Sequence, residues 1–298
     1  MQYIWFDGKM VPHADATIHL LNHSLHYGSG VFEGVRCYET PKGPAVFRLK
    51  DHVKRLFHSA QVMGMKVPYS QAQIIAAAKK VVRMNKLKEC YIRPIIFYGD
   101  KMGLSPLGAP LHVAIAAWPW GKYLTKDSVS VLISSFIRLH HRSSVMTAKI
   151  SGHYSNSIIA SLEASKSGYD EALFLDDEGN IAEGPGENVF FVKNHTLYTP
   201  RVGKILPGIT RASVIALAPQ VGCPVVETTI RPRDLRKYSE AFFVGTAAEV
   251  NAIGKIDRVV FRDGHEGPVT KCIRTEYRRA IHGRIKAFAK WLDLVGKR

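Results

Sequence analysis

Lys149 lies in a stretch of small residues, TAKISGHY at positions 147 to 154, with no acidic neighbour to pair with its ammonium group. Most lysines are solvated surface charges, and that interpretation stays open from the stretch alone. A lysine amine can instead form a Schiff base with a carbonyl compound, and such a covalent bond needs an uncrowded setting. The stretch therefore predicts either a surface charge or a nucleophilic amine.

Three turns in the second half of the chain have the composition of anion or cofactor sites. PGITR at 207–211 places a threonine at a helix start, where free backbone N–H groups bind phosphate. GTAAE at 245–249 places a threonine beside exposed backbone donors after a strand. Glycine and threonine at a helix start also serve as a plain cap, and that interpretation stays open. In NIAEGPGENVFF, Glu183 and Glu187 flank a Gly-Pro-Gly bend between apolar segments. Acids that enter a core need a partner, so we expect one here.

The elements that must position these residues alternate along the chain. Asp51 should cap a helix that begins at position 51. Pro219 should end the helix expected at 207–218. Turn signals and hydrophobic periodicity predict a hairpin at 3–12, helices at 51–64, 70–85, 153–168, 207–218 and from 271 to the end, and strands at 30–39, 43–49, 89–99, 110–118 and 129–135. They also predict short strands joined by turns at 171–184 and 187–200, and a strand at 240–250 that breaks at Gly245. Ser70 and Gln73 have the spacing of a capping box.

This alternation predicts an α+β protein of two domains rather than one parallel sheet. We expect a small N-terminal domain at 1–118, a turn-rich linker at 119–128 and a larger C-terminal domain at 129–298 that carries the lysine.

Composition limits the class of protein. The 298 residues are 46% apolar and 22% charged, which is typical of a globular chain. The start lacks a secretory pattern and no run reaches the ~18 apolar residues of a membrane span, so we expect a cytoplasmic protein. The four cysteines, Cys37, Cys90, Cys223 and Cys272, are scattered, which favours reduced thiols.

The net charge of +16 makes nucleic acid a candidate partner. No helix-turn-helix or base-stacking motif supports that role, so nucleic-acid binding is not our prediction. The basic segment after Lys271 has apolar residues at helical spacing, which is typical of a surface helix with a solvated basic face. The reason for the high charge is not evident from the sequence.

The chemistry-bearing stretches together resemble a known enzyme family. AEGPGENVFF, with TAKISGHY before it and LPGITR and GTAAE after it, resembles the fold-type IV pyridoxal phosphate aminotransferases. HYGSGVFEGVRCY, HVKRL, YIRP and AAWPWGKY resemble the branched-chain amino acid aminotransferases within that group. The resemblance implies the fold of the D-amino acid aminotransferases. It also implies a homodimer or higher oligomer that exchanges the amino group of leucine, isoleucine or valine with 2-oxoglutarate, giving branched 2-oxo acids and L-glutamate.

The resemblance assigns a role to each site residue. Lys149 would carry pyridoxal phosphate as a Schiff base and then act as general base and acid. Glu183 would face the pyridine nitrogen and Tyr154 the ring hydroxyl. The phosphate would be held by Arg55, Ile209, Thr210 and Thr246.

Substrate recognition is implied in the same way. The α-carboxylate would bind at Tyr91, Thr246 and Ala247, and an apolar pocket would be walled by Tyr27, Phe32, Trp120 and Tyr123. Arg93 would receive the side-chain carboxylate of glutamate. Without the resemblance, aromatic residues like these are core residues and Arg93 is a structural arginine. We treat Glu187 as structural.

The sequence departs from the family pattern at a few positions. Ile150, Ser151, Gly152 and His153 follow the lysine where the family often has glycines, and NAI stands at 251–253. His140 and His141 are adjacent, which is poor spacing for metal ligands, so we expect no metal.

The alternatives are a D-amino acid or amine aminotransferase, or an aminodeoxychorismate lyase, on the same fold. The sequence does not rank valine, leucine and isoleucine, since a methylene in an apolar pocket changes binding by only about 1 to 3 kcal/mol. It also leaves open whether the enzyme acts in biosynthesis or in catabolism.

Overall fold

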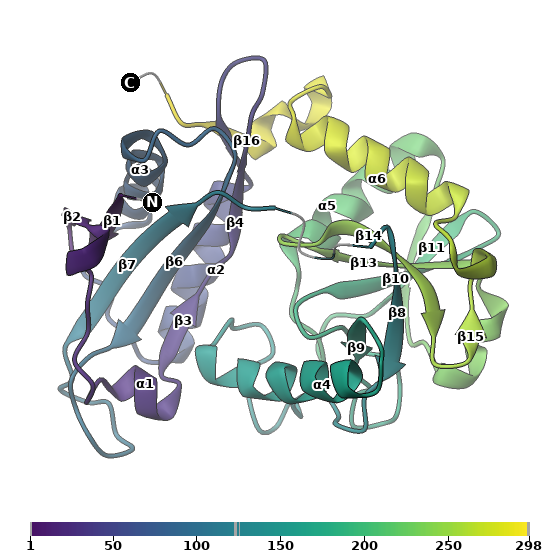
Figure 1. Cartoon of the computed structure of the whole chain (residues 1–298), viewed down its shortest axis with the longest axis horizontal. Coiled ribbons are helices and arrows are strands. Elements are labelled where there is room, and N and C mark those ends of the chain that lie inside the picture. Colours follow the sequence, from purple (N-terminus) through teal and green to yellow (C-terminus); the bar gives the residue numbers. More distant parts are fainter. Residues whose placement is uncertain (1, 122–123, 125, 297–298) are drawn as a thin grey trace. The chain divides into compact units, whose positions relative to one another are not determined.

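The computed structural model describes residues 2–121, 124 and 126–296, which form two compact units (Figure 1). The N-terminal unit takes in the described residues of Met1–Gly121, Ala148–His153 and Ala280–Arg298, and the C-terminal unit those of Lys122–Thr147 and Tyr154–Arg279. The segment with Lys149 thus packs with the N-terminal unit. These discontinuous units differ from the continuous ranges 1–118 and 129–298, and the domain boundaries stay a prediction.

The N-terminal unit contains a sheet with the order β16-β5-β4-β6-β7-β1-β2, in which β3 also pairs with β6. Its strands are β1 (Tyr3–Phe6), β2 (Lys9–Pro12), β3 (Gly30–Phe32), β4 (Val35–Tyr38), β5 (Ala45–Phe47), β6 (Cys90–Tyr98), β7 (Leu111–Trp118) and β16 (Leu292–Leu294). Helices α2 (Leu49–Val62) and α3 (Gln71–Met84) cover the sheet and share one apolar core with it, while the short α1 (His23–Tyr27) contacts β6 (Figure 1).

Local signals account for much of this unit. Asp7 and Gly8 both have positive φ, so the predicted β1–β2 hairpin closes through a turn of the kind that favours this pair. The capping box of Ser70 and Gln73 is confirmed. The expected cap of α2 is wrong: the helix begins at Leu49 with Arg48 as N-cap, and Asp51 lies in its first turn.

The C-terminal unit contains the second sheet, with the order β12-β11-β10-β13-β14-β8-β9 and β15 beside β14. Its strands are β8 (Ser128–Ile133), β9 (Glu171–Leu173), β10 (Asn188–Lys193), β11 (Thr196–Pro200), β12 (Val225–Thr228), β13 (Glu240–Gly245), β14 (Glu249–Ile256) and β15 (Val259–Val260). Its helices are α4 (Tyr154–Lys166), α5 (Ile209–Leu217) and most of α6 (Pro268–Ile281). The predicted α+β fold is confirmed.

In the segment 171–184, expected as short strands joined by turns, β9 is followed by an isolated bridge between Leu175 and Ile181. One predicted element differs from the structure. The last helix, α6, ends at Ile281 rather than continuing to the terminus, because Gly283 takes a left-handed conformation (φ 71°). A 3-10 helix (Lys286–Trp291) and β16 follow.

Two predictions about the class of protein can be compared with the structure. The four cysteines are free thiols, as predicted. Among the described residues, none of the helices combines the length and the apolarity needed to cross a membrane.

Candidate active site

Backbone hydrogen bonds fix the segment around Lys149 within the N-terminal unit. The Phe32 N–H donates to the Lys149 carbonyl oxygen at 3.2 Å, and the Gly152 N–H donates to the Gly28 carbonyl oxygen at 3.0 Å. A Cβ on Gly28 would lie 2.7 Å from the Gly152 Cα, so these two glycines permit the close approach. On the other side, the Lys149 N–H donates to the Ser59 hydroxyl oxygen at 2.9 Å. The main chain of the lysine is therefore held from both directions.

The Lys149 side chain is half-buried rather than fully solvated. Its Nζ lies 5.1 Å from the centroid of the Phe32 ring, within cation–π range. The structure thus places the predicted nucleophile beside a predicted pocket residue. The side chain is therefore partly buried beside an aromatic ring, and its role as a nucleophile stays a prediction.

Arg55 extends from α2 and forms a two-point contact with Glu33. Its Nε donates to Glu33 Oε1 at 2.6 Å and its Nη2 donates to Glu33 Oε2 at 2.9 Å. His52 Nδ1 lies 2.7 Å from the same Oε2. Burial opposes ionisation of Glu33, but the charges and hydrogen bonds of Arg55 and His52 outweigh it and hold the pKa of this carboxyl far below its usual range.

His52 is buried beside these charged groups. Burial lowers the pKa of its imidazole, although the Glu33 carboxylate partly opposes the shift. His52 is therefore neutral at neutral pH and donates its Nδ1 hydrogen to Glu33. Sequence reasoning singled out Arg55 and missed Glu33 and His52, which stand in the quoted stretches VFEG and HVKRL.

A cluster of aromatic residues surrounds Arg93 on β6. The Arg93 Cζ lies 4.7 Å from the Phe32 ring centroid and 5.3 Å from that of Tyr91, and its Nη2 donates to Tyr91 Oη at 3.3 Å. The Tyr91 and Trp120 rings are 4.7 Å apart. Arg93 Nε and Trp120 Nε1 are buried with no hydrogen-bond partner among the described residues. Each of these two N–H groups can donate a hydrogen bond to a ligand.

The room for Tyr91 depends on a glycine. A Cβ on Gly34 would lie 1.8 Å from Tyr91 Oη, so any side chain there would displace the phenol. Tyr27 makes its own contacts, with its ring 4.6 Å from that of His23 and its Oη accepting from the Gly103 N–H. Tyr123 lies outside the described residues. The roles of both tyrosines stay predictions.

Glu183 is a buried acid of the C-terminal unit. Its Oε1 accepts from Arg138 Nε at 2.8 Å, its Oε2 accepts from Asn188 Nδ2 at 3.0 Å, and the Leu206 N–H donates at 3.1 and 3.2 Å to the two oxygens. The expected partner of this acid is therefore an arginine 45 residues earlier in the sequence. Sequence reasoning missed Arg138 as a site residue, although it lies in the markedly basic segment FIRLHHRSS at 136–144.

Asn188 depends on Gly208 for its position. Its Nδ2 also donates to the Leu206 carbonyl oxygen at 3.1 Å, and a Cβ on Gly208 would lie 1.9 Å from its Oδ1. Gly208 is the N-cap of α5 and has no side chain to satisfy the first N–H groups of the helix, which belong to the buried Ile209 and Thr210. A phosphate can take that place at a helix start.

The remaining predicted residues of the C-terminal unit lie at element ends. Thr246 and Ala247 form the turn between β13 and β14, and Tyr154 begins α4; all three are half-buried. Glu187 is buried and accepts from the Gly186 N–H at 3.1 Å, which agrees with a structural role.

The amino-transferase class IV family profile matches residues 30–256 of the chain. The chain belongs to this family. A branched-chain-amino-acid aminotransferase of Pseudomonas aeruginosa is 46% identical over 297 residues, covering 98% of this chain and 97% of that protein. The crystal structure of the Escherichia coli branched-chain amino acid aminotransferase superposes with a TM-score of 0.96 at 40% identity, with 99% of each chain covered.

A second solved structure is of a holo-form with the cofactor. The branched-chain amino acid aminotransferase from Thermobaculum terrenum in its pyridoxal phosphate form has a TM-score of 0.94 and 35% identity, covering 99% of this chain and 99% of that one. The resemblance to the branched-chain amino acid aminotransferases, inferred from the motifs, is thereby confirmed over nearly the whole chain.

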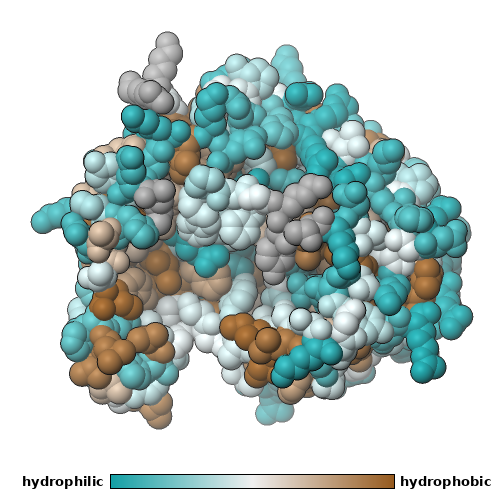
Figure 2. All heavy atoms as spheres, viewed as in Figure 1, coloured by the Kyte–Doolittle hydropathy of each residue, from teal (hydrophilic) through white to brown (hydrophobic). Residues whose placement is uncertain are grey.

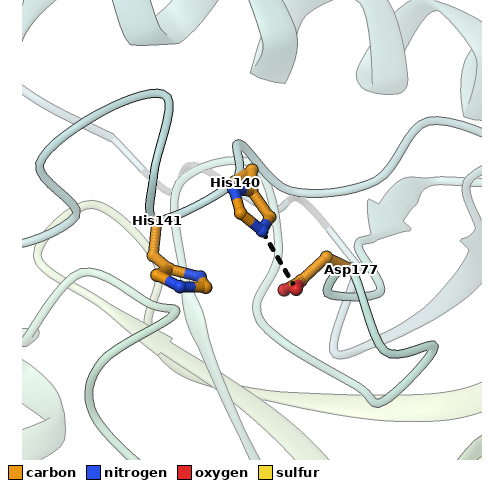
Figure 3. A group of neighbouring side chains, drawn as sticks. All are labelled: His140, His141 and Asp177. Atoms are coloured by element: carbon orange, nitrogen blue, oxygen red, sulfur yellow. Dashed lines mark ion pairs between the residues drawn. The ribbon is translucent and has the colours of Figure 1, made fainter.

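In this class IV aminotransferase, the adjacent histidines lie close to an acid (Figure 3). His140 Nε2 is 3.2 Å from Asp177 Oδ2, and the rings of His140 and His141 are 4.3 Å apart. His140 Nδ1 accepts from the Arg142 N–H, so the ring hydrogen is on Nε2, the atom that would have to bind a metal. The other Asp177 oxygen lies 2.8 Å from Lys204 Nζ. These contacts favour a hydrogen-bonded surface network, and the absence of a metal stays a prediction.

Proposed function

We propose that the chain is a branched-chain-amino-acid aminotransferase that uses pyridoxal phosphate to exchange amino groups between leucine, isoleucine or valine and 2-oxoglutarate. Relatives at 40 to 46% identity over nearly their full length carry this name. The observation that carries the proposal in this chain is the position of Arg93, whose guanidinium lies against the Phe32 and Tyr91 rings. An apolar wall with a guanidinium beside it suits both a branched aliphatic side chain and the carboxylate of glutamate.

The residues fit the cofactor. Arg55 is fixed by Glu33, the start of α5 lacks a side-chain cap, and Arg138 Nη1 is buried without a hydrogen-bond partner among the described residues. Pyridoxal phosphate, when bound, supplies an electron sink that stabilises negative charge at the substrate α-carbon.

The phosphate would be held by Arg55 and, at helix α5 and the β13–β14 turn, by Ile209, Thr210 and Thr246. Tyr154 would donate to or accept from the ring hydroxyl. Glu183, whose charge Arg138 balances, would hold a proton on the pyridine nitrogen.

Lys149 would provide the acid–base chemistry. Its Nζ would carry the cofactor covalently in the resting enzyme and, once released by an amino acid, accept the proton from the substrate α-carbon. The hydrogen bonds at Phe32 and Ser59 fix the Lys149 backbone, so that only the side chain needs to move. A fixed backbone orients the amine and lowers the entropic cost of reaction.

Substrate recognition would depend on both ends of the amino acid. Tyr91 and the backbone at Thr246 and Ala247 would bind the α-carboxylate. The side chain would lie against Phe32 and Trp120, with Tyr27 and Tyr123 completing the pocket, and Arg93 would meet the side-chain carboxylate of glutamate.

We also propose a homodimer or a higher homo-oligomer. The N-terminal unit exposes large apolar side chains near α1 and in the 100–108 loop, and Figure 2 shows hydrophobic surface gathered on this part of the unit. The exposed residues are Ile18, Leu20, Leu21, Leu25, Tyr27, Met102, Leu104 and Leu107. Such a patch is larger than isolated exposed residues explain and is typical of an interface. Light scattering after gel filtration would test this, and a monomer with full activity would contradict it.

We place the enzyme in the cytoplasm, because four free thiols suit a reducing compartment.

The cofactor attachment has a direct test. Borohydride reduction of the purified protein followed by peptide mapping should find the cofactor on Lys149. Label on any other lysine would overturn the proposed role of this residue.

A further inference from the structure

Glu33 is an ionised side chain with no exposure to solvent. Its relative exposure is 0%, and both of its oxygens accept hydrogen bonds from α2: Oε1 from Arg55 Nε, and Oε2 from Arg55 Nη2 and His52 Nδ1. A buried carboxylate needs such partners, because an isolated one would lose its hydration without compensation. Stability alone is a weak explanation, since apolar residues of similar volume often replace a buried ion pair without loss.

The position of Glu33 in the chain connects it to the site. Phe32, its neighbour, bonds to the Lys149 backbone, and the Glu33 N–H donates to the Pro94 carbonyl oxygen at 2.9 Å, next to Arg93. The backbone that carries the Glu33 carboxylate is therefore fixed by hydrogen bonds to two other segments. The carboxylate can hold the side chains of Arg55 and His52 in fixed positions.

Helix α2 presents one polar face to this anchor. His52, Arg55 and Ser59 are three and four residues apart, so they follow one side of the helix, while Val53 and Leu56 are buried in the core. The Ser59 hydroxyl donates to the Arg55 carbonyl oxygen at 2.9 Å and accepts from the Lys149 N–H. One helical turn thus holds both the guanidinium and the backbone of the lysine.

We propose that Glu33 is a positioning residue that fixes the guanidinium plane of Arg55 for the cofactor phosphate, with His52 Nδ1 holding the second carboxylate oxygen in place. The inference rests on the proposed function, which assigns Arg55 to that phosphate. By engaging Nε and one hydrogen of Nη2, Glu33 determines the direction of the Nη1 edge of the guanidinium. A flexible arginine would lose rotamer freedom on binding, and the two-point contact removes most of that loss in advance.

Charge and orientation make opposite predictions for a neutral variant. Glu33→Gln removes a negative charge beside Arg55, which by electrostatics alone should strengthen phosphate binding. It also replaces one acceptor oxygen with an amide that cannot accept from Arg55, so the two-point contact is lost. If orientation dominates, phosphate binding weakens instead, and the sign of the effect separates the two explanations.

The experiment compares pyridoxal phosphate with pyridoxal, which lacks the phosphate. Dissociation constants of both compounds are measured by absorbance titration for the full chain stripped of cofactor. We expect Glu33→Gln to weaken pyridoxal phosphate binding by at least about tenfold, and pyridoxal binding by less than about twofold. In the background of Arg55→Met, Glu33→Gln should cause no further loss, because its effect passes through Arg55.

Two further variants serve as controls. Glu171→Gln changes another buried glutamate, one that accepts from the Ser161 hydroxyl, and should leave both affinities within about twofold. Glu33→Asp keeps the charge but moves the carboxylate back by one methylene group, and it should show the same phosphate-selective loss. It replaces Glu33→Gln in the comparison if that variant does not fold.

The outcomes distinguish this inference from the proposed function. Unchanged or tighter pyridoxal phosphate binding in the Glu33 variants, equal losses for both compounds, or an additional loss beyond Arg55→Met would overturn the role of Glu33. If Arg55→Met itself binds pyridoxal phosphate normally, the assignment of Arg55 is wrong and the inference falls with it. A phosphate-selective loss confined to enzymes that retain Arg55 supports it.

Discussion

Replacing Arg93 with methionine should separate the two kinds of amino donor. The substitution keeps a long, unbranched side chain between the Phe32 and Tyr91 rings but removes the guanidinium 4.7 Å from the Phe32 ring centroid. Leucine needs only the apolar wall. Glutamate needs a partner for its second carboxylate, and an unpaired carboxylate in such a setting costs several kcal/mol.

The magnitude follows from the contacts. Arg93 also donates to Tyr91 Oη at 3.3 Å, and the loss of that bond, about 1 kcal/mol, falls on both donors alike. Hydrogen bonds to a charged group contribute about 1.5 to 3 kcal/mol, and these are lost for glutamate alone. We therefore expect the glutamate half-reaction to slow by at least about tenfold more than the leucine half-reaction, which corresponds to ~1.4 kcal/mol.

Single-turnover rates for L-leucine and L-glutamate, followed through the cofactor absorbance, give this ratio directly. Arg36 provides a matched comparison, because it is paired with Tyr91 across β4 and β6 and its guanidinium lies 4.9 Å from the Tyr38 ring. Arg36→Met should slow both donors in parallel. Equal losses in Arg93→Met, or a glutamate-selective loss in Arg36→Met, would refute the assignment of the carboxylate site to Arg93.

Three further predictions concern the groups that support the site. Ser59→Ala removes the acceptor of the Lys149 N–H and should lower the free energy of unfolding by about 1 to 3 kcal/mol, measured by urea denaturation, while slowing both donors equally; a donor-selective effect would contradict this. Gly208→Ala would push the Asn188 amide off its acidic partner and should reduce kcat for every donor, whereas a change in donor preference at full rate would argue against it. The pKa of Glu33 in the folded protein is far below 4.5, the ordinary value for a glutamate. This difference stabilises the fold at pH values above 4.5, and the stabilisation is lost as the pH falls below that value. Between pH 7 and pH 6 Glu33 should therefore add almost no slope to the unfolding free energy, and Glu33→Gln should flatten the loss of stability below about pH 5. An identical acid profile would contradict this.

Local sequence signals predicted the elements that depend on neighbouring residues. The Asp7-Gly8 hairpin and the capping box at Ser70 and Gln73 are examples, since each is decided within a few residues. The continuous strand expected at 30–39 is instead divided into β3 and β4. The break falls at Glu33 and Gly34, where the carboxylate turns to α2 and the missing Cβ leaves space for Tyr91 Oη.

Partners that are distant in sequence were not predictable in this way. Glu33 and Arg55 are 22 residues apart, and Arg138 and Glu183 are 45 apart, so each pair is brought together only by the fold. The sequence indicated that Glu183 needs a partner, but not which residue supplies it. Ser59 was missed for the same reason. Its hydroxyl accepts from the Lys149 N–H, and these two residues are 90 apart in the sequence.

The most direct test of the account is the reaction itself. Purified protein with pyridoxal phosphate, incubated with L-leucine and 2-oxoglutarate, should yield 4-methyl-2-oxopentanoate and L-glutamate in equal amounts by mass spectrometry. Lys149→Ala, folded to the same extent by circular dichroism, should yield neither. Reaction with D-leucine in place of L-leucine, or turnover by the Lys149 variant, would contradict the proposed function.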